Sequence, residues 1–474
     1  ACWRTGPRRM TPVATRALAL ASVLVATSCT LVPPYERPEI DLPATYFRAP
    51  ADTTTSIADL PWWQVFDDAK LVALIREALS DNLDLRVAAT QIVQAQAQVA
   101  AARSPIFPQI SGQASASRSN ENATLSTTNG FAAALALSWE LDFWGRYRAA
   151  TQAAQAQLLA TEEGRNGVVV SLVSGVAQLY LTLNGLQQRL AIVRNTAATQ
   201  RDSLRLVELL AEHGVQSAAE VRQAQTQLLT TENQIPVIEL SLAQNEDALA
   251  TLLGKPPHAF DIGTTLAADA VPPAVPAGLP SELLERRPDI RQAEQQLVAA
   301  NANIGVARAQ FFPTISLTGA LGRASDVLVG LVDSRGIGTH AIGAAIGVPI
   351  FQGGALVANY EAAKARADQA AVQYRQTVLT ALKEVSDALA AYDRNAAQTR
   401  GNRDRVAVAA DYLKLADLRF RAGVISYLEV LDAQRQLFAA QLDLNASEVN
   451  QRLAAVQLYK ALGGGWRVAN EARS

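Results

Sequence analysis

Three carboxylates are the residues best placed to act on a passing ligand. Glu220 follows one glycine–valine pair, while Glu429 and Asp432 follow another. Side chains three apart share a helix face, so Glu429 and Asp432 would project together. In an oligomer each position would become a ring of negative charge, which favours cations in a narrow pore. From the residues alone a solvated helix face explains them better, because charged side chains are mostly exposed.

Other reactive residues are sparse. The histidines are His213, His258 and His340, and no two are close in sequence. No nucleophile–base motif or phosphate-binding loop occurs, which disfavours an enzyme and predicts no cofactor and no metal. A net charge of −2 without a lysine- or arginine-rich block gives no sign of nucleic-acid binding. Protonation of His213 could make the docking of a partner protein pH-sensitive. The plainer interpretation is that His213 is an exposed histidine without such a role.

The elements that must position these residues are organised around two similar junctions. Phe107-Pro108 and Phe312-Pro313 each follow a helical pattern and precede an alternating one. Proline pushes the preceding residue towards extended geometry, so a helix should become a strand at both places. The similarity of the two stretches predicts one structural unit used twice.

A β-hairpin should follow each junction, at residues 109–141 and 314–350. Apolar and small polar residues alternate there over about ten residues per strand, the length of a transmembrane β-strand. A half-buried hairpin of a soluble protein gives the same pattern. Four strands cannot close a membrane barrel, and an open sheet in lipid leaves edge groups unsatisfied. A membrane role would therefore require an oligomer, with eight strands in a dimer or twelve in a trimer.

Long helices make up most of the remainder, and Pro236 is the one proline inside those named below, where it should kink the helix over 217–253. The first repeat spans 67–260 and the second 281–465, with a connector at 261–280 and a tail at 466–474. Each repeat should contain two long helices, at 145–212 and 217–253 and then at 353–421 and 426–462. The pairs turn at Gly214-Val215 and Gly423-Val424, because glycine commonly ends a helix.

The N-terminal residues are typical of an exported protein. Within residues 1–28, Arg16 precedes a short apolar run, which is the pattern of a signal peptide. Cys29 stands directly after small residues, which favours lipid attachment at this cysteine over an ordinary cleavage site. Residues 29–66 would then be the lipid anchor and a proline-rich extended linker.

Several motifs together resemble one family. They are Leu-Leu-Glu-Arg-Arg-Pro-Asp-Ile at 283–290, Trp-Trp-Gln-Val-Phe-Asp-Asp at 62–68 and Trp-Glu-Leu-Asp-Phe-Trp-Gly-Arg at 139–146. The chain resembles the outer-membrane efflux proteins of the TolC/OprM type, in their lipoprotein (NodT-like) branch. The resemblance implies an α+β membrane protein: a homotrimer with a twelve-stranded transmembrane β-barrel, continued by a long α-helical periplasmic barrel.

The same resemblance assigns partners and site residues. It implies a periplasmic adaptor (membrane fusion) protein that docks at the tips, an inner-membrane RND transporter, and outer-membrane lipid around the barrel. Glu429 and Asp432 match acidic positions that line the closed periplasmic aperture, and Glu220 and Phe420 match positions whose contacts hold it shut. The chain departs from the family pattern at Phe420, which lacks a tyrosine hydroxyl, and at Ile425, where an arginine can stand.

Three functions follow as hypotheses. The first is an exit duct of an RND-type efflux pump that passes drugs or other small toxic compounds. The second keeps the fold but exports proteins or oligosaccharides. The third, a lipid-anchored coiled-coil scaffold without a pore, is disfavoured because each hairpin is built directly onto a long helix.

Overall fold

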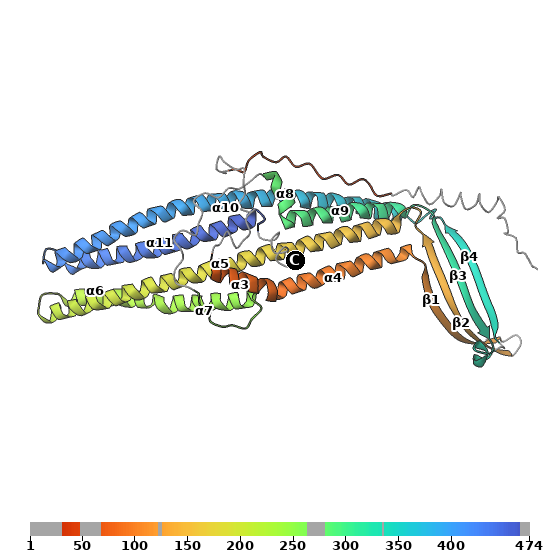
Figure 1. Ribbon diagram of the computed structural model, residues 1–474, viewed down its shortest axis with the longest axis horizontal. Helices are drawn as coiled ribbons and strands as arrows, with labels where there is room; N and C mark the ends of the chain where they lie inside the picture. Colours follow the sequence, from red (N-terminus) through yellow and green to blue (C-terminus); the bar gives the residue numbers. More distant parts are fainter. Residues whose placement is uncertain (1–30, 48–67, 122–125, 263–279, 334–335, 465–474) are drawn as a thin grey trace, which may run out of the picture. The chain divides into compact units, whose positions relative to one another are not determined.

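The computed structural model describes residues 31–47, 68–121, 126–262, 280–333 and 336–464 (Figure 1). The expected signal peptide and Cys29 lie outside these residues, as do most of the connector and the tail. The chain divides into two compact units. Among the described residues, the strand unit comprises 31–39, 91–121, 126–161, 292–333 and 336–374. The tip unit comprises 40–47, 68–90, 162–262, 280–291 and 375–464.

The strand unit contains one antiparallel sheet in the order β1-β2-β3-β4 (Figure 1). Its strands are β1 (Gln109–Glu121), β2 (Ser126–Leu141), β3 (Thr314–Ser325) and β4 (Ile337–Gly347). β2 pairs with β3 from Phe131↔Ser325 to Leu141↔Ile315, which joins the two hairpins into one sheet. β1 and β4 are the edges, so each has one side without a partner strand in the described part of the chain.

The register gives the sheet two different faces. Leu135 pairs with Leu321 on one face, while Ala136 pairs with Ala320 on the other. Side chains of directly paired residues share a face. The first face therefore carries exposed aliphatic groups, namely Ile110, Leu135, Leu321, Ile342 and Ile346. The second carries small or polar residues, among them Ser111, Gln113, Ala136, Ala320, Ala341 and Thr339.

Helices reach the sheet from both halves of the chain. In the strand unit α4 (Leu83–Arg103) leads through the 3-10 turn η2 (Ser104–Ile106) into β1, and α9 (Pro288–Ala309) leads into β3. A second 3-10 turn, η4 (Leu328–Leu331), follows β3. Two helices of 67 residues, α5 (Arg146–Glu212) and α10 (Ala355–Arg421), begin in this unit and continue into the tip unit. Ile304 and Ala307 of α9 pack against Ala363 and Ala367 of α10.

The N-terminal residues of the strand unit lie along α9. Arg37 donates to both carboxylate oxygens of Glu294, at 2.7 and 2.8 Å. Asn301 donates to the carbonyl of Pro33 at 2.9 Å. Val32 lies so close to Gly305 that a Cβ at that glycine would collide with it. This part of the expected linker is therefore held by specific contacts.

The tip unit is helical. Besides the distal parts of α5 and α10 it holds α3 (Ala69–Asp81), α6 (Ala218–Glu232), α7 (Gln234–Leu252), η3 (Pro280–Glu282), α8 (Leu283–Arg286) and α11 (Tyr427–Ala461). The helix expected over 217–253 is divided at Asn233 into α6 and α7, three residues before the kink expected at Pro236. Pro236 is the third residue of α7, where its missing amide costs no intrahelical bond.

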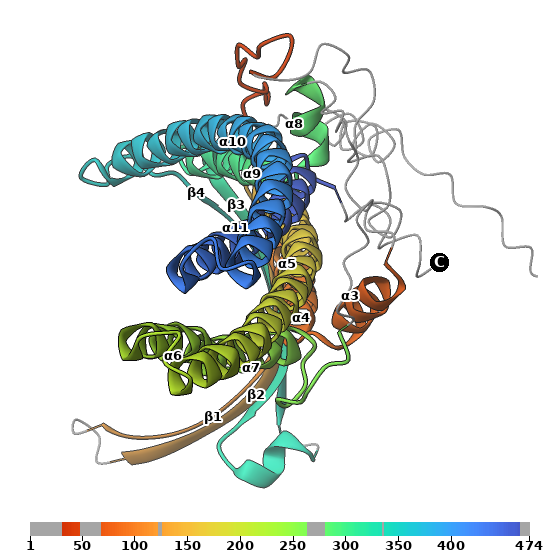
Figure 2. The same ribbon diagram turned by 90° about the vertical axis from the view of Figure 1, so that its left-hand side faces the viewer.

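Two helical hairpins, α5 with α6 and α10 with α11, lie side by side in the tip unit (Figure 2). Asn445 of α11 donates to the carbonyl of Gly185 on α5 at 2.9 Å. A Cβ at Gly185 would collide with Val449, so the glycine permits this close approach. α5 is the one helix in the described part of the chain long and apolar enough to cross a membrane, and 56% of that apolar window is buried inside the protein.

Arg287 joins three helices at the other end of the tip unit. Its guanidinium donates to the carbonyl of Ala461 at the end of α11 (2.8 Å) and to Glu384 of α10 (2.7 Å). It also makes two hydrogen bonds with Asp289, at 3.0 and 2.7 Å. Arg287 is only 7% exposed. Buried charges persist in proteins when they are paired in this way, so this residue explains the structural use of the Arg-Arg-Pro-Asp motif.

Candidate functional site

The two hairpin turns of the tip unit have the same geometry. Gly214 and Gly423 adopt φ of 74° and 70°, a left-handed conformation that favours glycine. Val215 donates to the carbonyl of Leu210, and Val424 to the carbonyl of Arg419, each at 2.9 Å. With the companion bonds from the two glycines, these contacts form the Schellman motif that ends a helix. Both valines are about two-thirds exposed, so each turn presents an aliphatic side chain to the surroundings.

Glu220 is engaged within its own hairpin. Ser217 caps α6, and its backbone amide donates to the Glu220 carboxylate at 2.8 Å. The Glu220 amide donates in return to the Ser217 hydroxyl at 3.3 Å, which completes a capping box. The structure therefore gives this carboxylate a role in starting α6. Its expected contact across the aperture stays a prediction.

Glu429 occupies the matching place in the second hairpin but makes a different contact. Ser426 and Glu429 repeat the spacing of Ser217 and Glu220, yet Ser426 makes no side-chain cap bond. The Glu429 carboxylate lies 3.6 Å from the guanidinium of Arg419 at the end of α10. The partner of this acid is therefore a nearby cation and not the helix cap.

Asp432 also has partners on its own helix. Arg435 donates to it at 2.8 Å and Gln436 at 2.6 Å. These hydrogen bonds, Arg435 first, lower the pKa of Asp432 from its ordinary value. Asp432 and Arg435 also line a pocket of about 370 Å³ between α6 and α11, together with Arg222. Because arginines accompany both acids, the net negative charge of this region is smaller than the carboxylates alone suggest.

Phe420 lies in an apolar cluster that fixes the two hairpins to each other. Its ring is 5.5 Å from that of Tyr427. Tyr427 is 2% exposed, and burial raises the pKa of its phenol. The buried members of the tip cluster come from all four helices: Val207, Ala224, Ala416, Tyr427, Val430, Leu431 and Ala433. Ile425 packs against the same cluster, so contacts that a latch arginine could make are apolar here.

The helix-to-strand junctions are held by two tryptophans of the strand unit. The indole of Trp139 donates to the carbonyl of Ile106 at 2.9 Å, next to the first junction. The indole of Trp144 donates to the carbonyl of Pro313 at 2.7 Å, and its ring stacks on Phe312 at 4.7 Å. Phe107 is extended, with φ −100° and ψ 154°, as expected for the residue before Pro108.

The structure thus groups the expected site residues in two places. Gly214, Gly423, Phe420, Glu429 and Asp432 belong to the hairpin ends of the tip unit, while the junctions belong to the strand unit. Sequence reasoning overlooked Arg419, Trp139 and Trp144. Both tryptophans stand in a motif noted above, but nothing local indicates that their partners are 33 and 169 residues away.

Comparison with known proteins places the chain in a family. The model of the family "Outer membrane efflux protein" matches residues 74–255 and 279–464. The probable efflux pump outer membrane protein TtgC of Pseudomonas putida is 39% identical over 458 residues, covering 94% of each chain. The cation efflux system protein CusC of Escherichia coli is 37% identical over 456 residues, covering 94% of this chain and 97% of the relative.

Solved structures give the same result. A crystal structure of CusC matches with a TM-score of 0.83 and 35% identity, covering 92% of this chain and all of the other. The open state of the MtrE outer membrane channel of Neisseria gonorrhoeae matches with a TM-score of 0.85 and 31% identity, covering 92% and 99%. These findings confirm the expected resemblance, the efflux role and the outer-membrane location. The chain belongs to the outer membrane efflux protein family, whose members are transport channels and not enzymes.

Proposed function

We propose that this protein is the exit duct of a tripartite RND-type efflux pump and works as a homotrimer. Three copies of the four-stranded sheet would close a twelve-stranded barrel in the outer membrane. The observation that carries the proposal is the sheet itself, which has two free edge strands and one aliphatic face. In lipid every backbone polar group needs a partner, and pairing β1 of one copy with β4 of the next supplies it.

The two faces of the sheet fit this arrangement. The exposed aliphatic groups of one face, such as Leu135 and Ile342, suit contact with lipid. The small and polar residues of the other face suit a water-filled interior. The β2–β3 pair joins the two hairpins into one sheet. Each hairpin would contribute two of the four strands that one protomer adds to the barrel, which supports the internal duplication expected from the sequence.

The helical hairpins would form the periplasmic part of the duct. The proposed docking tips for a periplasmic adaptor are Gly214-Val215 and Gly423-Val424. Their exposed valines offer two similar aliphatic contact surfaces to a partner protein. Glu429 and Asp432 would contribute charge at the periplasmic aperture, tempered by Arg419 and Arg435. Lipid on Cys29 would anchor the N-terminus, and the contact of Arg37 with Glu294 would hold the following chain against α9.

Small toxic compounds are the proposed cargo. TtgC of one Pseudomonas putida strain is named as a toluene efflux protein, and ArpC of that species as an antibiotic efflux protein. Their sequences match nearly the whole chain, which supports small molecules over proteins or oligosaccharides. An inner-membrane RND transporter would supply the energy and select the compounds.

Reconstitution in a planar lipid bilayer tests the proposal. We expect discrete single-channel currents from the purified protein, and chemical cross-linking should give a ladder that ends at three subunits. A protein that inserts but never conducts would contradict the duct, and a ladder that ends at two would contradict the trimer. The protein can also be expressed, with its matching adaptor and transporter, in a strain that lacks its own outer membrane efflux protein. That strain should then regain resistance to toluene or antibiotics.

A further inference from the structure

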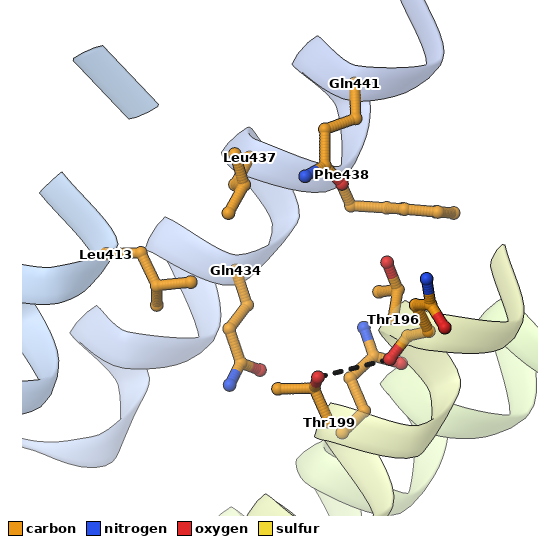
Figure 3. Close-up of a pocket in the computed structure, with 9 residues that line it drawn as sticks. Thr196, Thr199, Leu413, Gln434, Leu437, Phe438 and Gln441 are labelled. Atoms are coloured by element: carbon orange, nitrogen blue, oxygen red, sulfur yellow. Dashed lines mark hydrogen bonds between the residues drawn. The ribbon is translucent and has the colours of Figure 1, made fainter. Parts of the chain in front are cut away.

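A small pocket in the tip unit is lined by amides and hydroxyls. It lies between α5 and α11 and has a volume of about 160 Å³ (Figure 3). Gln434 and Gln441 of α11 face Thr196 and Thr199 of α5 across it (Figure 3). Asn195 and Gln200 complete its polar lining, and Leu413, Leu437 and Phe438 its apolar lining. No charged residue lines the pocket, which favours an uncharged occupant.

Three amide atoms at this pocket are buried without a hydrogen-bond partner among the described residues. They are Nε2 and Oε1 of Gln200 and Oε1 of Gln434. Gln200 is 3% exposed and Gln434 8% exposed. Among the described residues, the side-chain amide of Gln434 makes one hydrogen bond, from its Nε2 to the hydroxyl of Ser203 at 3.1 Å. Buried polar groups are nearly always paired, with protein or with ordered water.

The pocket has the properties that water requires. Its volume exceeds the space of one water several-fold, and a buried water needs two to four polar partners. The unpaired atoms include a donor and two acceptors, which water can satisfy together. The hydroxyl of Thr199 donates to the carbonyl of Asn195 at 3.1 Å, so it remains available to the pocket as an acceptor.

We propose that this pocket is a water-binding site that acts as a hydrated joint between α5 and α11. The idea rests on the proposed function, in which the hairpin ends open and close an aperture. An apolar contact would lose its packing if α11 moved along α5. Amides can instead exchange one water partner for another at little cost, so the joint would permit the movement while the tip cluster holds the closed arrangement.

The joint can be tested by removing its polarity without changing its size. Methionine is similar in length to glutamine but makes no comparable hydrogen bond, so the test variant is Gln200→Met with Gln434→Met. We expect the trimer of this variant to resist heat at least as well as the wild type. Its open probability in bilayer recordings should fall about five- to tenfold, the change that roughly one lost hydrogen bond produces. A high-resolution map of the wild type should show ordered water against Gln200.

Two controls keep the result specific. Gln244→Met, at an exposed position of α7, should gate normally. Gln200→Met with Gln434→Asn keeps one amide at the pocket, so its open probability should fall less than that of the double methionine variant. Unchanged gating in the double methionine variant, or a dry pocket in the map, would overturn the joint. Absence of any wild-type current would instead overturn the proposed duct, and the map alone would then decide whether the pocket binds water.

Discussion

Replacing Arg287 with alanine should loosen the end of α11. The guanidinium is the shared donor for the carbonyl of Ala461, for Glu384 and for Asp289. The side chains of Glu384 and Asp289 are 48% and 46% exposed, so water can replace the arginine there and each pair contributes less than about 1 kcal/mol. The buried carbonyl of Ala461 loses a charged donor, which costs about 1.5–3 kcal/mol.

Loss of the packed aliphatic stem adds to these effects. Together with the lost hydrogen bond to Ala461 and the two half-exposed pairs, this gives an expected destabilisation of about 3 kcal/mol. Amide hydrogen exchange is a suitable assay, because it reports local opening. Exchange of the amides in the last turn of α11 should accelerate about a hundredfold or more.

Two variants sharpen the interpretation of this experiment. Arg287→Lys keeps the charge but cannot reach three acceptors with a planar fork, so it should lose about half as much stability. Arg394→Ala removes an arginine whose side chain is 84% exposed beside Asp393, and it should change exchange very little. If exchange at the end of α11 were the same in Arg287→Ala as in the wild type, the proposed joining role of Arg287 would be wrong.

Four further changes have expected outcomes. Hydrogen bonds lower the pKa of Asp432, so this carboxylate should keep its charge to more acidic pH than an ordinary aspartate. Asp432→Asn should therefore weaken the cation selectivity of the channel at neutral pH. Equal reversal potentials for the variant and the wild type would contradict this. Gly423→Ala places a side chain at φ 70° and should destabilise the turn by about 1 kcal/mol. Limited proteolysis should then cut this turn faster, whereas the control Ala422→Gly should not strain the turn. Trp144→Phe keeps a ring beside Phe312 but removes the hydrogen bond to the carbonyl of Pro313, which should lower the stability by about 1 kcal/mol. Thermal unfolding measures this change, and an unchanged midpoint temperature would show that stacking alone holds the junction. Cys29→Ala should abolish labelling by a radioactive fatty acid, and persistent label would refute lipid attachment at that residue.

The sequence predicted the elements well wherever the signal is local. Alternation located all four strands, and Gly214 and Gly423 indicated turns that do adopt positive φ. The helix breaks at Asn233 and not at Pro236 as expected, because proline is tolerated in the first turn of a helix and Pro236 lies in the first turn of α7.

Contacts between distant residues were beyond such reasoning. Ser217 with Glu220 and Ser426 with Glu429 have identical spacing, yet only the first pair forms a capping box. In the second hairpin the Glu429 carboxylate lies instead beside Arg419, a neighbour that the spacing of Ser426 and Glu429 does not reveal. The unpaired amide of Gln200 was equally hidden, because nothing in a run of helical residues reveals which polar side chain meets an incompletely filled interface.

The equal length of α5 and α10 constrains how this protein can evolve. Each has 67 residues, and their distal ends share one apolar cluster that includes Val207 and Ala416. Inserting a single residue into one helix would advance its end by 1.5 Å and rotate it by about 100°, which would turn the cluster residues away from their neighbours. Insertions and deletions should therefore survive only when they occur in both helices and in their return helices together. Steps of seven residues, close to two full turns, are the smallest that would preserve the contact, so duct length should vary among relatives in such increments.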